Sequence, residues 1–303
     1  MMQLCLSAFP NAKALPLWIA QEKGFFGKRG LQLEIDWTES SKEQREGLVS
    51  GRVQLVQSAV DNGLALITAG HDVIIAMGGE AGMNDFIVQP EFGALSDLKG
   101  RTLVVDSPDT AYALLARKML ARAGLVYQTD YRMNPVGNGA KRLAALLASK
   151  EAAGGVLNPP YTAQAKAAGL KSLGRLVDHL GPYQAGGLFV MRAYAKANSA
   201  AVEAFIASYV EALRFARQKT NENFCIDLLA RHLKVERAVA QATLAEALDP
   251  AFGFALDARL DRTGLANVLA TRAETEGDDP RLSEPSRYID ESWYERALAS
   301  LEN

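Results

Sequence analysis

Short stretches in which apolar and polar residues alternate predict strands early in the chain, at residues 3–8, 31–37 and 53–56. The segments between them predict helices, over residues 15–26 and from about residue 38 to the glycines at 47–51. A helix over 63–69 and a strand over 73–77 follow. This order of strand, helix, strand, helix and strand calls for a parallel sheet with right-handed crossovers.

A glycine-rich stretch, residues 78–90, interrupts this order. Its glycines at positions 78, 79 and 82 allow the backbone to approach a bound molecule closely or to adopt a positive φ. The apolar run 86–88 predicts a short buried strand, and Pro90 ends it because proline cannot donate to a ladder. We interpret the stretch as a hinge strand behind a ligand cleft, where the chain passes from one lobe to another. An ordinary glycine-rich turn between strands is the alternative interpretation.

The same order of elements restarts beyond Pro90. Strands are expected at 101–105, 131–136 and 155–157, and each ends in an elbow of glycine, proline, asparagine or serine that opens a helix. Open α/β sheets bind their ligands at such carboxyl ends of strands. The return crossing is expected at 188–192, and the chain beyond 199 is mostly helical. The predicted fold is α/β, with lobe 1 formed by residues 1–84 and 191–303, lobe 2 by 85–190, and hinges near 83–90 and 186–192.

In the helical part that starts at Ser199, apolar residues recur on one face. This spacing predicts core positions and gives these side chains no chemical role. They are Val202, Phe205, Ile206, Tyr209, Leu213 and Ala216. The polar, proline-bearing segment 277–285 predicts a surface loop before a last helix over 292–301.

The composition argues against a polyanionic partner. The 303 residues are 49% hydrophobic and carry a formal net charge of −2, without a basic run interleaved with aromatic residues. Nucleic acid and anionic membranes are therefore not expected partners. No apolar run approaches the ~20 residues that a membrane-spanning helix needs. The first residues lack the pattern of a secretory leader, so we expect either a cytoplasmic chain or one trimmed of its leader.

The positions of the cysteines and histidines do not indicate a metal or redox site. Cys5 and Cys225 lie far apart in the sequence, and a disulfide between them is not expected. The three histidines are scattered without ligand spacing, so neither a metal nor a cofactor is expected. Residues 137–142 lack the spacing and the hydroxyl residue of a phosphate-binding loop, so nucleotide binding is not expected either.

Several short motifs occur in an order and at spacings that resemble one known family. In the first lobe they are Pro16-Leu17-Trp18-Ile19-Ala20, Gly24-Phe25-Phe26 with Gly30-Leu31, and Gly47-Leu48 with Gly51 and Val53. In the second lobe they are Asp97-Leu98-Lys99-Gly100, Asp106 through Thr110, Gly124-Leu125, Asn158-Pro159-Pro160 and Gly181-Pro-Tyr-Gln184. Over nearly its whole length the chain resembles the periplasmic substrate-binding proteins of the nitrate/sulfonate/taurine and thiamine-precursor type of ABC importer.

The resemblance implies the type II periplasmic-binding-protein fold, with two α/β lobes joined by two crossing strands. Such lobes close on a small molecule by hinge motion, and the protein presents that molecule to a membrane permease. We accordingly expect a periplasmic monomer. The positions that match the family's cleft are Asn11, Lys13, Trp37, Ser58, Ala59, Asp61, Asn62, Gly79, Glu80, Asn84, Ser107, Asp109, Thr110, Tyr112, Asn138, Asn158, Tyr161, Tyr183 and Gln184.

The chemistry of these candidates leaves the charge of the ligand open. The helix that starts near Asp109 offers free N–H groups and a positive dipole end to an anion, unless Asp109 itself caps them. The aromatic candidates either stack on a flat ring or pack beneath their elbows. Lys13 is either a counter-ion or a solvent-facing lysine, whereas Glu80 and Asp61 would suit a cationic or N–H-rich ligand. Our hypothesis is a small organic anion or an aromatic or heterocyclic acid.

Enzymes share this fold, and an enzyme of the desulfinase, pyrimidine-synthase or menaquinone-pathway dehydratase type is the competing hypothesis. A cysteine nucleophile needs an exposed position and a nearby base. Cys5, however, lies between two leucines in an expected strand, and a cysteine-rich run of the pyrimidine-synthase kind is absent. A transcription-factor effector domain is not expected, since no helix-turn-helix precedes the first strand. We therefore expect a binding protein and not an enzyme.

Overall fold

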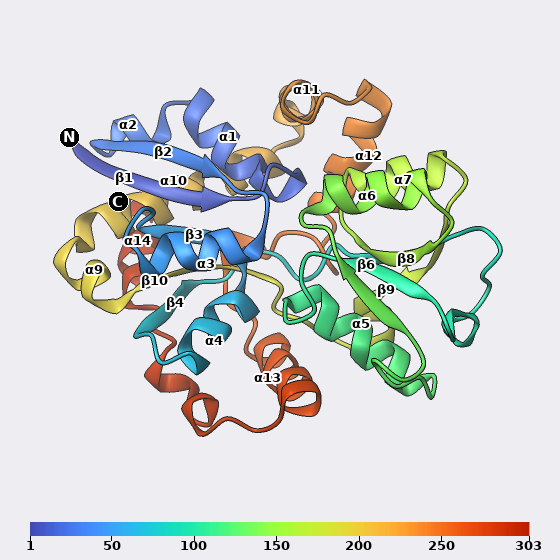
Figure 1. The fold of residues 1–303 in the computed structure, drawn as a ribbon. Coiled ribbons are helices and arrows are strands. Elements are labelled where there is room, and N and C mark those ends of the chain that lie inside the picture. The colour runs from blue at the N-terminus through green and yellow to red at the C-terminus, as the bar shows by residue number, and fades with distance from the viewer. Residues whose placement is uncertain (303) are drawn as a thin grey trace.

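Two five-stranded sheets lie side by side in the computed structural model, which describes residues 1–302, and helices pack around each sheet (Figure 1). The first sheet has the order β2-β1-β3-β10-β4 and the second the order β7-β6-β8-β5-β9. The first sheet contains β1 (Met2–Ala8), β2 (Leu31–Trp37), β3 (Leu55–Ala59), β4 (Val73–Met77) and β10 (Gly186–Met191). The second contains β5 (Asp85–Val88), β6 (Thr102–Val105), β7 (Arg132–Pro135), β8 (Ala152–Leu157) and β9 (Lys171–Arg175).

Each sheet is mixed, and one strand accounts for this in each case. In the first sheet β10 runs antiparallel to both β3 and β4, while β1 is parallel to β2 and β3. In the second sheet β5 runs antiparallel to β8 and β9, while β6 is parallel to β7 and β8. In each sheet the reversed strand is the first one that the chain forms after it has crossed from the other sheet.

The helices occupy the segments between the strands and most of the chain after β10. Those before β10 are α1 (Leu15–Glu22), α2 (Phe25–Lys28), α3 (Ser41–Val49), α4 (Val60–Thr68), α5 (Ala111–Arg122), α6 (Gly139–Ala148), α7 (Tyr161–Ala167) and α8 (Leu176–Leu180). Those after β10 are α9 (Arg192–Ala197), α10 (Ser199–Arg217), α11 (Glu222–Leu233), α12 (Arg237–Ala247), α13 (Arg262–Glu276) and α14 (Ser292–Glu302).

Three details differ from the elements expected from the sequence. The single helix expected over 15–26 is wrong, because the chain turns at Gly24, where φ is +69°, and continues as the separate helix α2. The third strand lies at Leu55–Ala59 and not at 53–56, since pairing with β1 and β10 determines its ends. The edge strand β9 was not expected, because its polar sequence shows little alternation and only its pairing with β5 makes it a strand.

The predicted core face of the long helix after β10 is confirmed. All six of its predicted core residues are at most 3% exposed within α10. The helix packs against α1 and α14 and so covers the first sheet (Figure 1).

Two segments carry the chain between the sheets, residues 78–84 and residues 181–185. The glycines of the first segment serve backbone packing: a Cβ at Gly78 would lie 2.4 Å from the carbonyl oxygen of Arg259, and one at Gly79 would lie 3.0 Å from the carbonyl carbon of Gly186. Gly82 has a φ of +105°. Close contacts with other parts of the chain thus account for the glycines at 78 and 79.

The crossing segments are bonded to each other at Glu80. Its backbone oxygen accepts from the N–H groups of Ala185 (3.1 Å) and Gly186 (3.0 Å). Residues 186–190, assigned to the second lobe from the sequence, pair with β3 and β4 of the first sheet. Helices α12 and α13 contact α7 and α5 respectively, so the chain after β10 touches both lobes. The lobe boundaries stay a prediction, because strand pairing does not assign these helices.

Candidate functional site

A cavity lies where the carboxyl ends of strands from both sheets meet. It is lined by the ends of β1 and β3, by residues directly after β6 and β8, and by the crossing segments at Glu80 and Gly186. The space free of protein atoms measures about 740 Å³, part of it open to solvent. Sites for small molecules lie preferentially where two domains meet. The cavity therefore has the place of a small-molecule site.

Ten of the side chains proposed from the sequence line this cavity. They are Asn11, Lys13, Ser58, Ala59, Asn62, Glu80, Thr110, Tyr112, Asn138 and Asn158. The other nine lie outside it: Trp37, Asp61, Gly79, Asn84, Ser107, Asp109, Tyr161, Tyr183 and Gln184. The sequence identifies the elbows, but an elbow turns sharply, so its neighbouring side chains point to opposite sides.

Three of the residues outside the cavity have side chains with partners elsewhere in the fold. Trp37 is 40% exposed, with its ring tilted against that of Trp18 at a centroid distance of 5.8 Å. Asp61 accepts from Arg272 Nη1 with both oxygens at 3.1 Å. Burial raises the pKa of the Asp61 carboxyl, and the Arg272 guanidinium offsets only part of that rise. Tyr161 Oη donates to the carbonyl oxygen of Pro10 in the other lobe at 3.2 Å.

The remaining outside residues belong to the crossing segments and to the outer mouth. Tyr183, Asn84 and Gly79 are buried within the fold, and the side-chain oxygen of Gln184 accepts from the backbone N–H of Asp261 at 2.6 Å. Ser107 and Asp109 line a more open hollow at the mouth of the cleft.

Several cavity residues were missed by the sequence reasoning. Asp106 directly precedes the proposed Ser107, so its position at the end of β6 was the available signal. Arg142 follows the proposed Asn138 within the first turn of α6. Tyr209 and Phe254 come from the chain after β10, and nothing in their sequence context separates them from core residues.

Lys13 and Glu80 form a buried ion pair on the cavity wall. Lys13 Nζ lies 2.6 Å from Glu80 Oε1 and donates to Tyr112 Oη at 2.5 Å, so it joins the first lobe to α5 of the second. Burial alone would lower the pKa of Lys13, but the Glu80 carboxylate and Tyr112 outweigh it and raise that pKa. Lys13 is therefore neither the free counter-ion nor the solvent-facing lysine of the two earlier alternatives.

Arg142 is the cation of the cavity that has no carboxylate partner. It is 5% exposed, and Nε and Nη1 donate to the backbone oxygens of Val156 (3.0 Å) and Gly137 (2.8 Å). Within residues 1–302, no carboxylate oxygen lies within 4.0 Å of its guanidinium nitrogens. Burial lowers the pKa of Arg142, with Asp106 the first of the nearby groups that oppose it. An arginine nevertheless stays charged, because its pKa is far above neutral.

The N-terminus of α5 also faces the cavity. Thr110 is its N-cap residue, and no side chain of the described residues caps the helix. Asp109, the alternative cap considered above, instead accepts from Ser107 Oγ and, at 2.9 Å, from Arg45 Nη2. Because the first N–H groups of a helix have no intrahelical acceptor, α5 presents donors and a positive dipole end to the cavity.

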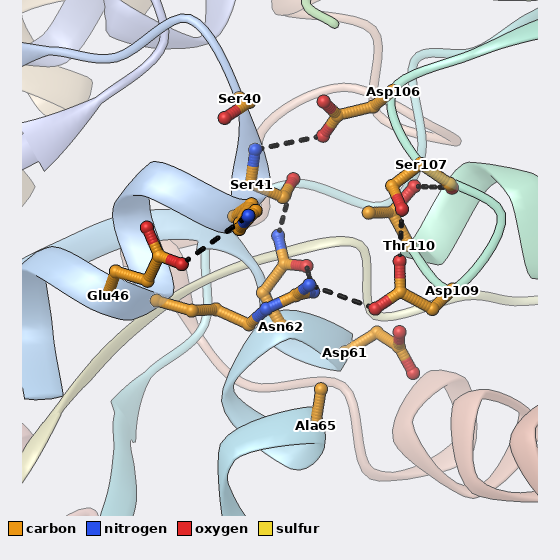
Figure 2. A network of polar contacts seen from close by, with 12 residues as sticks. Ser40, Ser41, Glu46, Asp61, Asn62, Ala65, Asp106, Ser107, Asp109 and Thr110 are labelled. Atoms are coloured by element: carbon orange, nitrogen blue, oxygen red, sulfur yellow. Dashed lines mark hydrogen bonds and ion pairs between the residues drawn. The ribbon is translucent and has the colours of Figure 1, made fainter. Parts of the chain in front are cut away.

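Direct bonds across the mouth join the two lobes, as Figure 2 shows around Ser41 and Asp106. The backbone N–H of Ser41, in the first turn of α3, donates to Asp106 Oδ2 at 3.0 Å. Arg45 pairs with Asp109 at 2.9 Å, and Lys141 with Glu39 at 2.5 Å. The two sides of the mouth are therefore in direct contact.

No metal centre or disulfide accompanies the cavity in the part of the chain that the structure describes. Within residues 1–302, no group of three or more His, Cys, Asp and Glu side chains could hold a metal ion. Cys5 and Cys225 are both free. No helix among these residues is both long and apolar enough to cross a membrane.

Two mixed α/β sheets, two crossing segments and a cavity at the strand ends define the type II periplasmic-binding-protein fold. The chain belongs to the NMT1-like family, which matches residues 2–230. The predicted fold and family are thus confirmed.

Solved structures share this fold over nearly the whole chain. A protein of Bordetella bronchiseptica RB50 is 23% identical with a TM-score of 0.87, and the match covers 100% of this chain and 99% of that one. The alkanesulfonate-binding protein of Xanthomonas axonopodis pv. citri, bound to MOPS, is 18% identical with a TM-score of 0.78, covering 95% and 98%. A desulfurization enzyme is 17% identical with a TM-score of 0.65, covering 99% and 100%. No match was found among curated proteins.

Proposed function

We propose that this protein is the solute-binding component of an ABC importer and that it captures a small organic anion by closure of its two lobes. Arg142 carries the proposal. This buried guanidinium donates only to backbone oxygens, and the charge of Asp106, which lies beyond 4.0 Å, offsets only part of the effect of its burial. Isolated buried charges are costly, and proteins pair them. A bound carboxylate or sulfonate would supply the missing charge with the geometry that arginine prefers.

The rest of the cavity supports an anion in the same place. Lys13 is neutralised by Glu80 at 2.6 Å, so it is not the free cation of the site. The uncapped start of α5 adds N–H donors and a positive dipole end. Because these donors and Arg142 come from the second lobe, the ligand would bind there first. Closure would then cover it with the first lobe.

The transport role rests on the family and on the structural relatives. An alkanesulfonate-binding protein shares the fold, and the chain is a member of the NMT1-like family. We propose that the protein acts as a periplasmic monomer and delivers its ligand to a membrane permease.

The competing hypothesis is an enzyme, since a desulfurization enzyme shares the fold. The cavity-lining residues among 1–302 include neither a cysteine nor a histidine. Those two side chains are the commonest nucleophile and general base in such sites. The observation favours binding over catalysis. Mass spectrometry of a ligand after prolonged incubation with the protein separates the two, because chemical conversion would establish the enzyme.

The proposal is tested by a thermal-shift screen of alkanesulfonates, carboxylates, nitrate, pyrimidines and amines, followed by titration calorimetry of the hits. A ligand at 100 times its Kd adds ~2.7 kcal/mol to the free energy of unfolding, which is easily detected. Arg142→Ala should weaken an acid hit by ~30-fold or more, because truncating one partner of a buried charge pair costs ~2–5 kcal/mol.

Lys141→Ala is the matched control, since the neighbouring Lys141 is half-exposed and pairs with Glu39 at the mouth. It should change affinity by less than ~3-fold, as exposed pairs contribute little. Melting curves without ligand show whether each variant is folded. Unchanged acid affinity in a folded Arg142→Ala variant would refute the assignment, as would a screen whose hits are all amines.

A further inference from the structure

Helix α13 forms a third connection between the two lobes. Before this helix, the backbone N–H of Ala255 donates to the oxygen of Gly79, in the first crossing segment, at 2.8 Å. After it, the chain reaches the edge of the first sheet, where the backbone N–H of Asp290 donates to the oxygen of Ile75 in β4 at 3.1 Å. Along the way, α13 lies between α4 and α5 (Figure 1). Its contacts therefore decide with which lobe it moves.

Polar contacts join the end of α13 to α5 of the second lobe. Lys118 Nζ lies 3.0 Å from Glu274 Oε1, and Arg117 pairs with Glu276. Arg117 also donates to the carbonyl oxygen of Thr275 at 2.6 Å. The side chains of Lys118 and Arg117 are only 10% and 19% exposed. Because partly buried ion pairs are screened less than exposed ones, these contacts hold α13 on α5.

Apolar packing and the second crossing segment hold the same helix. Leu265 and Val268 of α13 are buried in one core cluster with Leu115 of α5. Asn267 Nδ2 donates to the carbonyl oxygen of Pro182, in the second crossing segment, at 2.7 Å. Burial of apolar surface is the dominant favourable term in such packing. Helix α13 is therefore fixed to α5 from its first turns to its last.

The contact of α13 with α4 of the first lobe is of another kind. Within residues 1–302, one ion pair joins the two helices, that of Arg272 with Asp61, whose side chains are 12% and 3% exposed. Figure 2 shows the Asp61 side chain pointing toward the pale red helix, which is α13. Burial raises the pKa of Asp61, and Arg272 is the first of the charges that oppose this rise. The Asp61 carboxylate thus depends mainly on Arg272 for its compensation.

A buried ion pair at a boundary between two bodies acts as a condition for their contact. With the pair intact, attraction offsets the cost of removing both charges from water. With one partner removed, the other charge stays buried without compensation as long as α4 and α13 remain in contact. Separation of the two helices would return that charge to water. Loss of Arg272 therefore disfavours the packed arrangement of α4 and α13 relative to a separated one.

We propose that α13 moves with the second lobe and that Arg272, by pairing with Asp61, holds the first lobe against it when the lobes close. Arg272 is then a positioning residue for ligand capture, since it lies outside the cavity lining. The inference rests on the proposed function, because lobe closure is the step that it explains. It also assigns residues 262–276 to the second moving body, although the sequence placed them in the first lobe.

The test measures three distances between spin labels by double electron–electron resonance in the ligand-free protein. Val49→Cys on α3, Leu147→Cys on α6 and Ala270→Cys on α13 provide exposed labelling sites. Cys5→Ser removes the half-exposed native thiol, and the buried Cys225 stays unlabelled. The distance between positions 49 and 147 reports the separation of the lobes. The other two distances report which lobe α13 follows.

Arg272→Met is the decisive variant. With Arg272 present, each pair of labels should show one population. In Arg272→Met, the distances from position 49 to positions 147 and 270 should both gain a second population, shifted by more than ~2 Å, whereas the distance between positions 147 and 270 stays unchanged. The ratio of shifted to unshifted molecules should rise ~100-fold or more, because breaking a buried pair is strongly unfavourable.

Two further variants serve as controls. Asp61→Asn/Arg272→Met removes both charges and should return the distances to those measured with the pair intact. Arg262→Met is the matched control on the same helix, because Arg262 pairs with Glu291 but is 62% exposed. It should leave all three distances unchanged, as exposed pairs contribute little. Melting curves show whether each variant is folded.

Every other outcome overturns the inference. If the distance between positions 147 and 270 shifts and that between 49 and 270 does not, α13 belongs to the first lobe. If both distances broaden, the substitution only loosens α13. If no distance changes, or if the shifted population already dominates with the pair intact, Arg272 does not hold the lobes. None of these results needs a bound acid, so the proposed function stands or falls separately, on its own screen and on Arg142→Ala.

Discussion

The ion pair of Lys13 and Glu80 offers the sharpest test of how the cavity wall is held together. The Glu80 side chain is 3% exposed, and its carboxylate accepts from Lys13 Nζ (2.6 Å), Gly82 N (2.6 Å) and Met83 N (3.2 Å). Lys13→Met leaves that carboxylate with its two backbone donors only. Glu80→Gln leaves the ammonium group with Tyr112 as its one remaining partner. Each single change therefore leaves one buried charge without its ion-pair partner.

The expected losses of stability follow from that arrangement. Removing one partner of a buried pair costs ~3–5 kcal/mol, so each variant should melt ~6–10 °C lower at ~2 °C per kcal/mol. The double variant Lys13→Met/Glu80→Gln carries no charge at these two positions, and the glutamine oxygen still accepts from Gly82 and Met83. Its cost should be only ~1–2 kcal/mol. The coupling free energy of the cycle should accordingly reach at least ~2 kcal/mol.

The assay is denaturant and thermal unfolding of the four proteins, freed of ligand. The control cycle uses Lys42→Met and Glu46→Gln, an exposed pair on α3 at 3.8 Å, which should show no measurable coupling. If the stability losses of Lys13→Met and Glu80→Gln simply add up in the double variant, the reasoning is refuted, because neither charge then depends on the other.

The pH dependence gives a second readout of the same pair. The pKa of Lys13 is raised in the folded protein: burial would lower it, but Glu80 and Tyr112 outweigh burial. The stability that this pair contributes is therefore complete below the unfolded pKa of about 10.5. It should be lost as the pH rises above that value, and the Lys13→Met variant should lack this loss. An equal alkaline loss in both proteins would contradict the assignment.

Three further substitutions test local features. The ring of His232 stacks on Trp18 at 4.5 Å, and burial lowers the pKa of this histidine. The folded protein should therefore lose stability as the pH falls below 6.5. His232→Phe keeps the stack, so its melting temperature relative to the unaltered protein should be higher at pH 5 than at pH 7.5. Gly78→Ala should prevent folding or lower the melting temperature strongly, because its Cβ would lie 2.4 Å from the backbone oxygen of Arg259. Gly27→Ala meets no atom within 4 Å and should raise stability by ~0.4–1 kcal/mol; a loss there would contradict the view that only packing makes Gly78 intolerant.

The elements of the fold could largely be predicted from the chain because their signals are local. Alternation marks β1 and β2, and the apolar face of α10 follows from helical spacing alone. Where the local signal was weak, the prediction failed: β9 becomes a strand only through pairing with β5, and Gly24 divides a continuous apolar segment. The restart of the order of elements beyond Pro90 indicated two lobes, and the resemblance to a family supported that arrangement.

Only part of the candidate site could be predicted from such local signals. Strand ends are local features, so the sequence located Lys13, Glu80 and Tyr112 on three separate segments. It could not show that they meet, because Lys13 and Tyr112 lie 99 residues apart in the chain and come together only in the tertiary structure. Arg142 and Asp106 were passed over for the same reason: an unpaired charge is recognisable only once every neighbour is known.

The sequence by itself thus determined most of the strands, most of the helices and the positions of the elbows, since these follow from the spacing of residues within one segment. Tertiary structure alone decided which elbow side chains point inward. It also decided which buried charges form ion pairs and which have no ion-pair partner. Hydrophobic periodicity acts over a few residues, whereas the electrostatics of a buried cavity depends on groups that are a hundred residues apart in the chain.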